Sequence, residues 1–241
     1  MLKDKNSLYA PILVVLLVVA AFFIGQLSAK VSLKEEVNGD SKVAVPTATT
    51  SKISVANLKI MAKDLGVDSS KFDQCLDDGT YAEKVGAETK EGQGFGVSGT
   101  PSFFINGILI VGSLPQADFE AVIDAELKNG SGDKVKLASV GEALTRVEGI
   151  PYGVGYIKGN KNAKIKIMEY TDFECPYCNK SFPTIEALLA KYGDKISLEY
   201  RSFPLPFHAD AQKSAEAVLC AGDQGKFWEM HDKTFVVMAG N

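Results

Sequence analysis

Two cysteines separated by two residues are the part of the chain best suited to chemistry. They lie in Cys175-Pro176-Tyr177-Cys178, which follows an alternating apolar run and opens a helical pattern. A thiol attacks a disulfide only as its thiolate, so one cysteine of such a pair needs a lowered pKa. The start of a helix favours negative charge through unpaired N–H groups and the helix dipole. We therefore expect Cys175 to be the nucleophile and Cys178 to be the resolving thiol.

The residues around the dithiol modify this expectation. Asp172 and Glu174 would oppose a thiolate at Cys175 if they point toward it, unless solvent screens them. Pro176 suits the first position of a helix, where its missing N–H would have no partner. Tyr177 adds no positive charge, and we expect Pro176 and Tyr177 to contact substrate. The motif alone does not set the oxidising strength of the site.

Glu169 is the carboxylate expected to work with the dithiol. It continues the two-residue period of Ile165 and Ile167, which places it on the core-facing side of a strand. A buried carboxylate there has a raised pKa and can relay protons as Cys178 changes state. The alternative is a solvated side chain at the end of the strand. We favour the relay.

A second segment, Thr100-Pro101 followed by Ser102 and the apolar run 103–105, complements the dithiol. A cis proline would present a peptide edge opposite Cys175, and the Thr100 backbone could then pair with an extended substrate. A trans bond is the commoner state of X-Pro in general. The dithiol in the same chain favours cis, and we assign Pro101 to the catalytic site.

The elements that position these segments follow from periodicity and from Gly, Pro and capping residues. Asn106-Gly107 between two apolar runs predicts a hairpin, and residues 140–147 of a connecting stretch suit a short helix. The pattern predicts strands at 103–105, 108–111, 165–173 and 196–203, and helices at 54–65, 69–76, 81–92, 115–127, 176–192, 210–221 and 226–236.

The beginning of the chain reads as a membrane anchor. Residues 9–29 include an uncharged stretch of about 20 residues, enough to cross a hydrocarbon core of roughly 30 Å. A cleaved signal peptide is the alternative, although the end of the stretch is a poor cleavage site. We expect a short tail over residues 1–8, a transmembrane helix over 9–29 and a flexible linker over 30–53.

Charge and cysteine content narrow the location and the partners. Lys3 and Lys5 precede the apolar stretch and Lys30 and Lys34 follow it, so flanking charge hardly fixes the orientation. The four cysteines favour an oxidising compartment. We expect a single-pass protein of the cell membrane with its catalytic domain on the extracytoplasmic side. A net charge of −4 without a basic run gives no indication of nucleic-acid binding.

Four separated blocks of the chain resemble the DsbA family. Residues 167–178 and 97–107 carry the dithiol and the Thr-Pro pair, and residues 225–231 and 72–76 resemble the helical insertion of that family. The resemblance implies an α/β, thioredoxin-like fold with an inserted helical subdomain over residues 54–241. It also implies a cofactor-free oxidase of exported proteins, reoxidised by a quinone-linked membrane partner of the DsbB or VKOR type.

The order of these blocks departs from the family, in which the dithiol comes first. Residues 54–128 resemble the C-terminal half of the fold and residues 150–241 the N-terminal half, joined by a linker over 129–149. A linker of about 20 residues spans up to roughly 65 Å, so one chain can close on itself. We therefore expect a circularly permuted domain. The alternative is a domain-swapped dimer, in which each half completes a neighbouring molecule.

The remaining cysteines and the two histidines have structural interpretations. In a DsbA-like arrangement Cys75 and Cys220 both fall in the helical insertion, where they could form a disulfide, whereas two inert buried thiols are the alternative. Zinc bound by the dithiol with His208 and His231 is not favoured, because a single C-x-x-C pair with an internal proline suits a redox turn better. We expect His208 at the surface and His231 in packing.

Three functions fit the sequence. The first is a membrane-tethered oxidase that forms disulfides in reduced exported proteins through a mixed disulfide. The second is a reductase or isomerase with the same site, which the reduction potential would distinguish. The third is an inactive, thioredoxin-like binding module, against which the presence of both cysteines and of the Thr-Pro pair argues.

Overall fold

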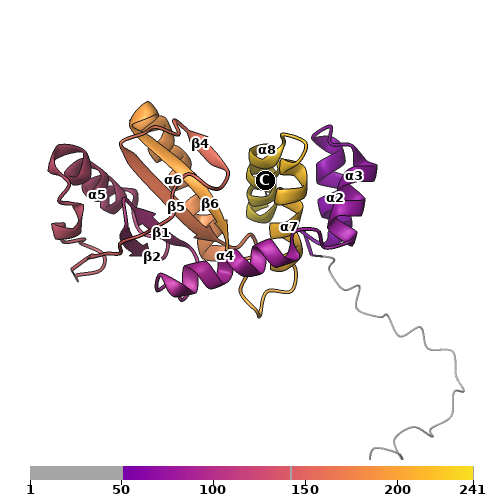
Figure 1. Ribbon diagram of the computed structural model, residues 1–241, viewed down its shortest axis with the longest axis horizontal. Helices are drawn as coiled ribbons and strands as arrows, with labels where there is room; N and C mark the ends of the chain where they lie inside the picture. The colour runs from indigo at the N-terminus through magenta and orange to yellow at the C-terminus, as the bar shows by residue number, and fades with distance from the viewer. Residues whose placement is uncertain (1–50, 142, 241) are drawn as a thin grey trace, which may run out of the picture. The chain divides into compact units, whose positions relative to one another are not determined.

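A mixed sheet of six strands lies at the centre of residues 51–141 and 143–240, the part of the chain described by this computed structural model (Figure 1). The strand order is β3-β2-β1-β5-β6-β4. Strands β5 and β6 are parallel, and the other neighbours are antiparallel. The strands are β1 (Ser102–Ile105), β2 (Ile108–Val111), β3 (Thr145–Arg146), β4 (Ile157–Gly159), β5 (Ile165–Thr171) and β6 (Ile196–Ser202).

The hairpin between β1 and β2 forms where the sequence predicts it. Asn106 has a φ of 47° and Gly107 a φ of 87°, and a tight two-residue hairpin turn needs positive φ at both positions. A Cβ atom at Gly107 would also lie 2.5 Å from the carbonyl oxygen of Val147. Both the turn and this close approach therefore require glycine at position 107.

The predicted helices are present, with small shifts at their ends. Ser54 caps the first one by accepting a hydrogen bond from the Asn57 N–H. Asp68 caps the second by accepting from the N–H groups of Ser70 and Lys71. The helices are α2 (Val55–Asp64), α3 (Ser69–Asp77), α4 (Ala82–Gly94), α5 (Gln116–Asn129), α6 (Pro176–Tyr192), α7 (Ala211–Gly222) and α8 (Phe227–Ala239).

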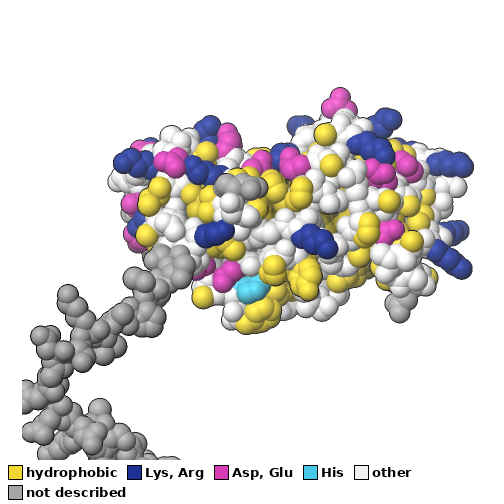
Figure 2. Space-filling model, turned by 180° about the vertical axis from the view of Figure 1, so that it is seen from behind, with side chains coloured by type: hydrophobic (Ala, Val, Ile, Leu, Met, Phe, Trp, Pro, Cys, Tyr) yellow, Lys and Arg dark blue, Asp and Glu magenta, His cyan; other side chains and the backbone are white. Residues whose placement is uncertain are grey.

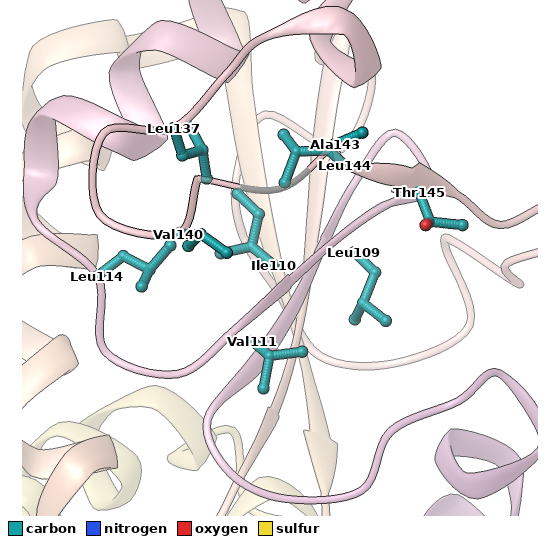
Figure 3. Close-up of a pocket in the computed structure, with 9 residues that line it drawn as sticks. All are labelled: Leu109, Ile110, Val111, Leu114, Leu137, Val140, Ala143, Leu144 and Thr145. Carbon is teal, nitrogen blue, oxygen red and sulfur yellow. The ribbon is translucent and has the colours of Figure 1, made fainter.

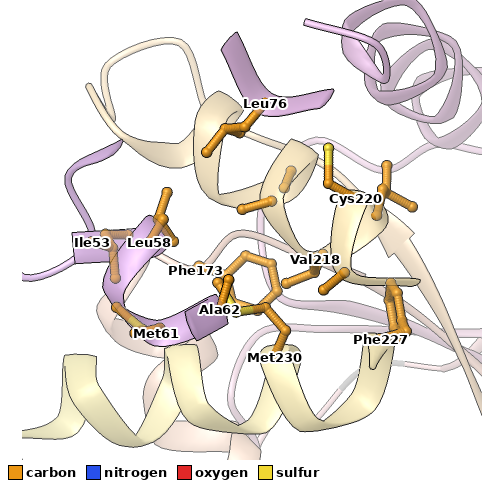
Figure 4. Close-up of a cluster of buried hydrophobic side chains, with 14 of the residues drawn as sticks. Ile53, Leu58, Met61, Ala62, Leu76, Phe173, Val218, Cys220, Phe227 and Met230 are labelled. Carbon is orange, nitrogen blue, oxygen red and sulfur yellow. The ribbon is translucent and has the colours of Figure 1, made fainter. Parts of the chain in front are cut away.

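The helical subdomain and the dithiol region share one apolar core. Side chains from α2, α3, α7 and α8 converge there on Phe173, which lies two residues before the first cysteine of the dithiol (Figure 4). The two cysteines of the dithiol belong to the same cluster. The core therefore fixes the start of α6 against the helical subdomain. Its members shown in Figure 4 include Leu58, Met61, Leu76, Val218, Phe227 and Met230.

Residues 140–141 and 143–147, the described part of the expected short helix in the linker, are not helical. Thr145 and Arg146 instead form β3, which pairs antiparallel with β2. The Arg146 guanidinium lies 2.6 Å from a carboxylate oxygen of Glu126, and the Val147 N–H donates to the Gly107 carbonyl oxygen at 2.8 Å. The weak helical pattern was wrong because residues 145–147 pair with the edge of the sheet instead.

A buried carboxylate holds the chain as it leaves the linker. Glu199 on β6 accepts hydrogen bonds from the N–H groups of Gly153, Val154 and Gly155, at 2.6, 3.1 and 2.7 Å. It also pairs with the guanidinium of Arg201 at 2.8 Å, and both side chains are buried. This anchor leads the chain into β4, a three-residue edge strand that the sequence did not predict.

Both sequence halves contribute to one sheet within one chain. Residues 54–128 supply β1 and β2, and residues 150–240 supply β4, β5 and β6. Strands β1 and β5 join the halves through antiparallel pairing. The Lys52 ammonium donates to the Met238 carbonyl oxygen at 3.4 Å, so the first and last described residues are neighbours.

The expected membrane anchor, residues 9–29, and nearly all of the expected tether, residues 30–53, lie outside the described residues. Within residues 51–141 and 143–240, no helix combines the length and the apolar character needed to cross a membrane. The anchor therefore stays a prediction from sequence.

Candidate active site

The dithiol lies where β5 ends and α6 begins. Cys175 is the N-cap residue of α6, and Pro176 is the first residue of that helix. The Cys175 Sγ atom is 3.4 Å from the Thr100 carbonyl oxygen, although the two residues are 75 positions apart in the sequence. The Thr100–Pro101 peptide bond is cis, as expected. One chain thus brings the two predicted segments together.

The two free thiols of the motif differ in acidity. A hydrogen bond with the Cys178 thiol lowers the pKa of Cys175 well below its usual value, and the Tyr177 N–H adds to this effect against the opposing effect of burial. Burial raises the pKa of Cys178, and the neighbouring Cys175 raises it further. At neutral pH the arrangement favours a thiolate at Cys175 and a protonated thiol at Cys178. A nucleophile and a resolving thiol would require such an asymmetry, and the roles expected for Cys175 and Cys178 stay a prediction.

The two carboxylates that flank the dithiol face a loop rather than the thiol. Asp172 Oδ2 accepts from the Leu205 N–H at 2.9 Å and lies 2.7 Å from Nδ1 of His208. Its Oδ1 accepts from the Glu174 N–H, and Glu174 Oε2 accepts from the Asp210 N–H at 2.7 Å. These carboxylates are therefore bound by donors and hold residues 203–210, here named the clamped loop, next to the dithiol.

Glu169 is buried on the core side of β5, as its period in the sequence predicted. Glu169 is only 3% exposed. Burial raises its pKa to about 7, and Glu186 acts in the same direction, whereas the Thr171 side chain and the Lys158 ammonium partly offset the rise. A carboxyl group with this pKa can both hold and release a proton near neutral pH.

Thr171 is a residue of the site that the sequence reasoning missed. It ends β5 two residues after Glu169, and its buried Oγ1 has no hydrogen bond of ordinary length and angle with any described residue. The signal that would have found it was available, because the two-residue period that identifies Glu169 continues to Thr171.

The two histidines lie in different environments. His208 lies at the surface, as expected, but its side chain is only 15% exposed because it bonds to the buried Asp172 carboxylate. His231 is fully packed among aromatic rings, as expected, with Nδ1 2.8 Å from Asp232. Among the described residues, no group of three or more His, Cys, Asp or Glu side chains has the arrangement of a metal site.

An apolar surface with a groove adjoins the clamped loop. Tyr177 is 63% exposed and Phe207 is 75% exposed, and Figure 2 shows apolar side chains gathered around the histidine visible on that face. The groove has a volume of about 450 Å³ and lies between α4 and the clamped loop. Its lining includes Thr89, Gln93, Pro204, Leu205, Pro206 and His208.

A second pocket, of about 230 Å³, lies between β2 and the linker (Figure 3). None of its nine lining residues carries an ionisable side chain, and Leu109, Ile110, Leu137 and Leu144 are among them. This pocket offers apolar contact and lacks the groups that acid–base or thiol chemistry needs.

Cys75 and Cys220 form a disulfide, as the resemblance implied. Their Cα atoms are 5.9 Å apart, and the bond joins α3 to α7 across 145 positions of sequence. It therefore connects the two sequence halves within the helical subdomain and leaves Cys175 and Cys178 as the free thiols of the described chain.

A mixed sheet with a dithiol at a helix start, facing a Thr-Pro segment, defines a thioredoxin-fold protein. Two family models agree: a DSBA-like thioredoxin domain matches residues 48–124, and a thioredoxin model matches residues 153–237. Both matches support a fold of the thioredoxin superfamily for these segments, and the DSBA-like match suggests thiol–disulfide chemistry at the dithiol.

Curated relatives match shorter segments. The chain is 45% identical over 78 residues to the Na(+)/H(+) antiporter NhaA 1 of Salinispora arenicola, which covers 32% of this chain and 12% of the antiporter. It is 38% identical over 81 residues to NhaA 1 of Mycolicibacterium vanbaalenii, covering 33% of this chain and 13% of that protein. The chain spans about an eighth of the length of these relatives, so their names do not define its activity.

Proposed function

We propose that this protein is a DsbA-like oxidase that transfers its Cys175–Cys178 disulfide to the thiols of exported proteins. The observation that carries the proposal is the meeting of Cys175 with Thr100, 3.4 Å apart, at the start of α6. The opposite pKa shifts of the two thiols support it, because an acidic Cys175 is a good leaving group.

The reaction has two exchange steps. A substrate thiolate attacks the Cys175 sulfur of the oxidised protein, the Cys175–Cys178 bond breaks, and Cys178 leaves with the electron pair and takes up a proton. A second substrate thiolate then attacks the substrate sulfur of the mixed disulfide, and Cys175 leaves as a stabilised thiolate. The substrate has gained a disulfide and lost two electrons, which the dithiol now holds.

The surrounding residues have assigned roles in this proposal. Glu169 supplies the proton to Cys178, which its burial and its pKa of about 7 support. The Thr100 backbone pairs with an extended substrate segment next to Pro101. Pro176 and Tyr177 contact the substrate beside its cysteine, and the exposure of Tyr177 suits that role.

The cellular setting is part of the proposal. Residues 9–29 anchor the protein in the cell membrane, with the catalytic domain on the extracytoplasmic side. A quinone-linked membrane protein of the DsbB or VKOR type accepts the two electrons and regenerates the disulfide. The apolar stretch and the four cysteines of the sequence support this assignment.

We further propose that the fold is circularly permuted and closes within one molecule. The DSBA-like match precedes the thioredoxin match along the chain, and the contact between Lys52 and Met238 brings the described ends together. Light scattering coupled to size exclusion tests the closed form against a domain-swapped dimer. A stable dimer at low micromolar concentration would contradict the closed monomer.

Oxidation of a reduced, unfolded model protein tests the activity. We expect the oxidised protein to form disulfides stoichiometrically and Cys175→Ser to be inactive. Fusing residue 241 to residue 51 and opening the linker should preserve activity. No oxidation by the native protein would refute the proposal.

The reduction potential separates the oxidase from the reductase. We expect a value nearer that of DsbA, about −120 mV, than that of thioredoxin, about −270 mV. A value at the thioredoxin end, measured by equilibration with glutathione or dithiothreitol, would favour reduction instead.

A further inference from the structure

The Thr171 hydroxyl is an unusual feature of the region behind the dithiol. Its Oγ1 is buried and has no hydrogen bond of ordinary length and angle within the described chain. Buried hydroxyls nearly always have a partner, so an orphan inside a redox site needs an explanation. The hydroxyl also both donates and accepts hydrogen bonds, unlike a carbonyl or an ammonium group.

The position of Thr171 supplies that explanation. Thr171 and Glu169 are two residues apart on β5 and therefore project to the same side of the sheet. The Cys178 thiol, in the first turn of α6, faces the Thr171 side chain and the Asp172 N–H, both of which favour its thiolate. Glu169 is likewise affected by the Thr171 side chain. The hydroxyl thus lies beside both groups that must exchange a proton.

We propose that the Thr171 hydroxyl carries the proton between the Glu169 carboxyl group and the Cys178 sulfur. The inference rests on the oxidase function proposed above. As the Cys175–Cys178 bond breaks, the Cys178 sulfur accepts the hydroxyl proton of Thr171, and the oxygen of Thr171 takes the proton of Glu169. Thr171 ends the step unchanged, Glu169 ends as a carboxylate, and Cys178 ends as a thiol.

The other ionisable groups near Glu169 are already paired. Lys158, on β4, lies 2.8 Å from Glu186 on α6 and 2.8 Å from Asp232 on α8. On the remaining sides, Tyr200 of β6 has a pKa far above neutral because of burial. His231 of α8, whose pKa burial lowers, bonds to Asp232. Glu169 is therefore the group suited to supply the proton near pH 7.

Removing only the hydroxyl tests the relay. Thr171→Val keeps the shape of the side chain, and Thr171→Ser keeps the hydroxyl. The assay uses the oxidised protein and glutathione, and follows the first exchange step from pH 5 to pH 9, with rates corrected for the thiolate fraction of glutathione. In the native protein we expect a corrected rate that falls as the pH rises through about 7, where Glu169 loses its proton.

The two variants should then separate. We expect Thr171→Val to lower the corrected rate at pH 6 by about tenfold or more and to lose the inflection, because general acid catalysis typically contributes at least this much. Thr171→Ser should keep both the rate and the inflection. Glu169→Gln should match Thr171→Val, and the double variant should be no slower than either single one.

Several results would overturn the relay. A Thr171→Val variant with the native rate and inflection would do so, as would additive losses in the double variant. Circular dichroism and the urea midpoint show whether Thr171→Val folds. If it does not, the solvent deuterium isotope effect on the rate of the first exchange step decides. This effect should be larger in the native protein than in Glu169→Gln, and equal effects would reject the relay. A native protein that oxidises no substrate refutes the oxidase, whereas an active protein indifferent to Thr171 refutes the relay alone.

Discussion

Removing the Cys75–Cys220 disulfide should strongly destabilise the protein. The bond closes a loop of 145 positions, because Cys75 lies in the first sequence half and Cys220 in the second. In the loop-entropy description, a crosslink of that length stabilises the folded state by about 5 kcal/mol, at the upper end of measured disulfide contributions. We therefore expect the Cys75→Ala, Cys220→Ala double variant to lose about 3–5 kcal/mol of unfolding free energy.

The chain order makes this prediction quantitative. If residue 241 is fused to residue 51 and the chain is opened in the linker, the same disulfide closes a loop of only roughly 45 residues. Loop entropy depends on the logarithm of loop length, so the bond should contribute about 1 kcal/mol less in the rejoined protein. The folded structure around the bond is the same in both proteins, which isolates the effect of chain order.

Urea unfolding at equilibrium measures both quantities. Four proteins are compared: the native chain order and the rejoined order, each with and without the disulfide. All four should carry Cys175→Ser and Cys178→Ser so that no free thiol can exchange with the bond. A double variant as stable as its parent would refute the disulfide. An equal or larger contribution in the rejoined protein would refute the loop-entropy reasoning.

Three further predictions concern packing, pH and reactivity. Gly92→Ala should lower the free energy of unfolding by about 1–3 kcal/mol, because a Cβ there would lie 2.7 Å from the Tyr170 ring. Gly86 has open space around it, so Gly86→Ala should stabilise α4 by roughly 0.5–1 kcal/mol. The urea unfolding midpoints of the two variants test both values. The pKa of Glu169 is about 7 in the folded protein against 4.5 for an ordinary glutamate, so the folded state holds this proton more tightly than the unfolded state. The free energy of unfolding should therefore be highest below pH 4.5 and should fall by roughly 3 kcal/mol as the pH rises to 7. Glu169→Gln should remove this dependence, and an unchanged pH profile of stability would contradict the burial argument. Iodoacetamide should modify Cys175 almost as fast at pH 6 as at pH 8, whereas an ordinary thiol slows on the order of a hundredfold; a matching slowdown at Cys175 would contradict its lowered pKa.

Local signals in the sequence predicted most of the fold. The hairpin at Asn106-Gly107 follows from two residues that tolerate positive φ. The burial of Glu169 follows from its period along β5. The meeting of Cys175 with Thr100 needed more than local reasoning, because no short-range pattern connects residues 75 positions apart. The resemblance to a known family provided that link.

The features that sequence reasoning missed depend on distant partners. Strands β3 and β4 have two and three residues, so their own pattern is too short to identify them. Arg146 is ordered by Glu126, twenty positions earlier. The orientation of Asp172 depends on N–H and imidazole groups more than thirty positions later. In each case a partner distant in the sequence determines the conformation that the residue adopts.

The clamped loop has a consequence for anyone who transplants this dithiol. Asp172 accepts a hydrogen bond from the Leu205 N–H and bonds to the ring of His208, and Glu174 accepts one from the Asp210 N–H. Moved alone into another scaffold, the seven residues 172–178 would arrive with two unbound negative charges beside the sulfur and would make it a weaker acid. A transplanted dithiol therefore needs residues 203–210 with it, although the two segments are separated along the chain.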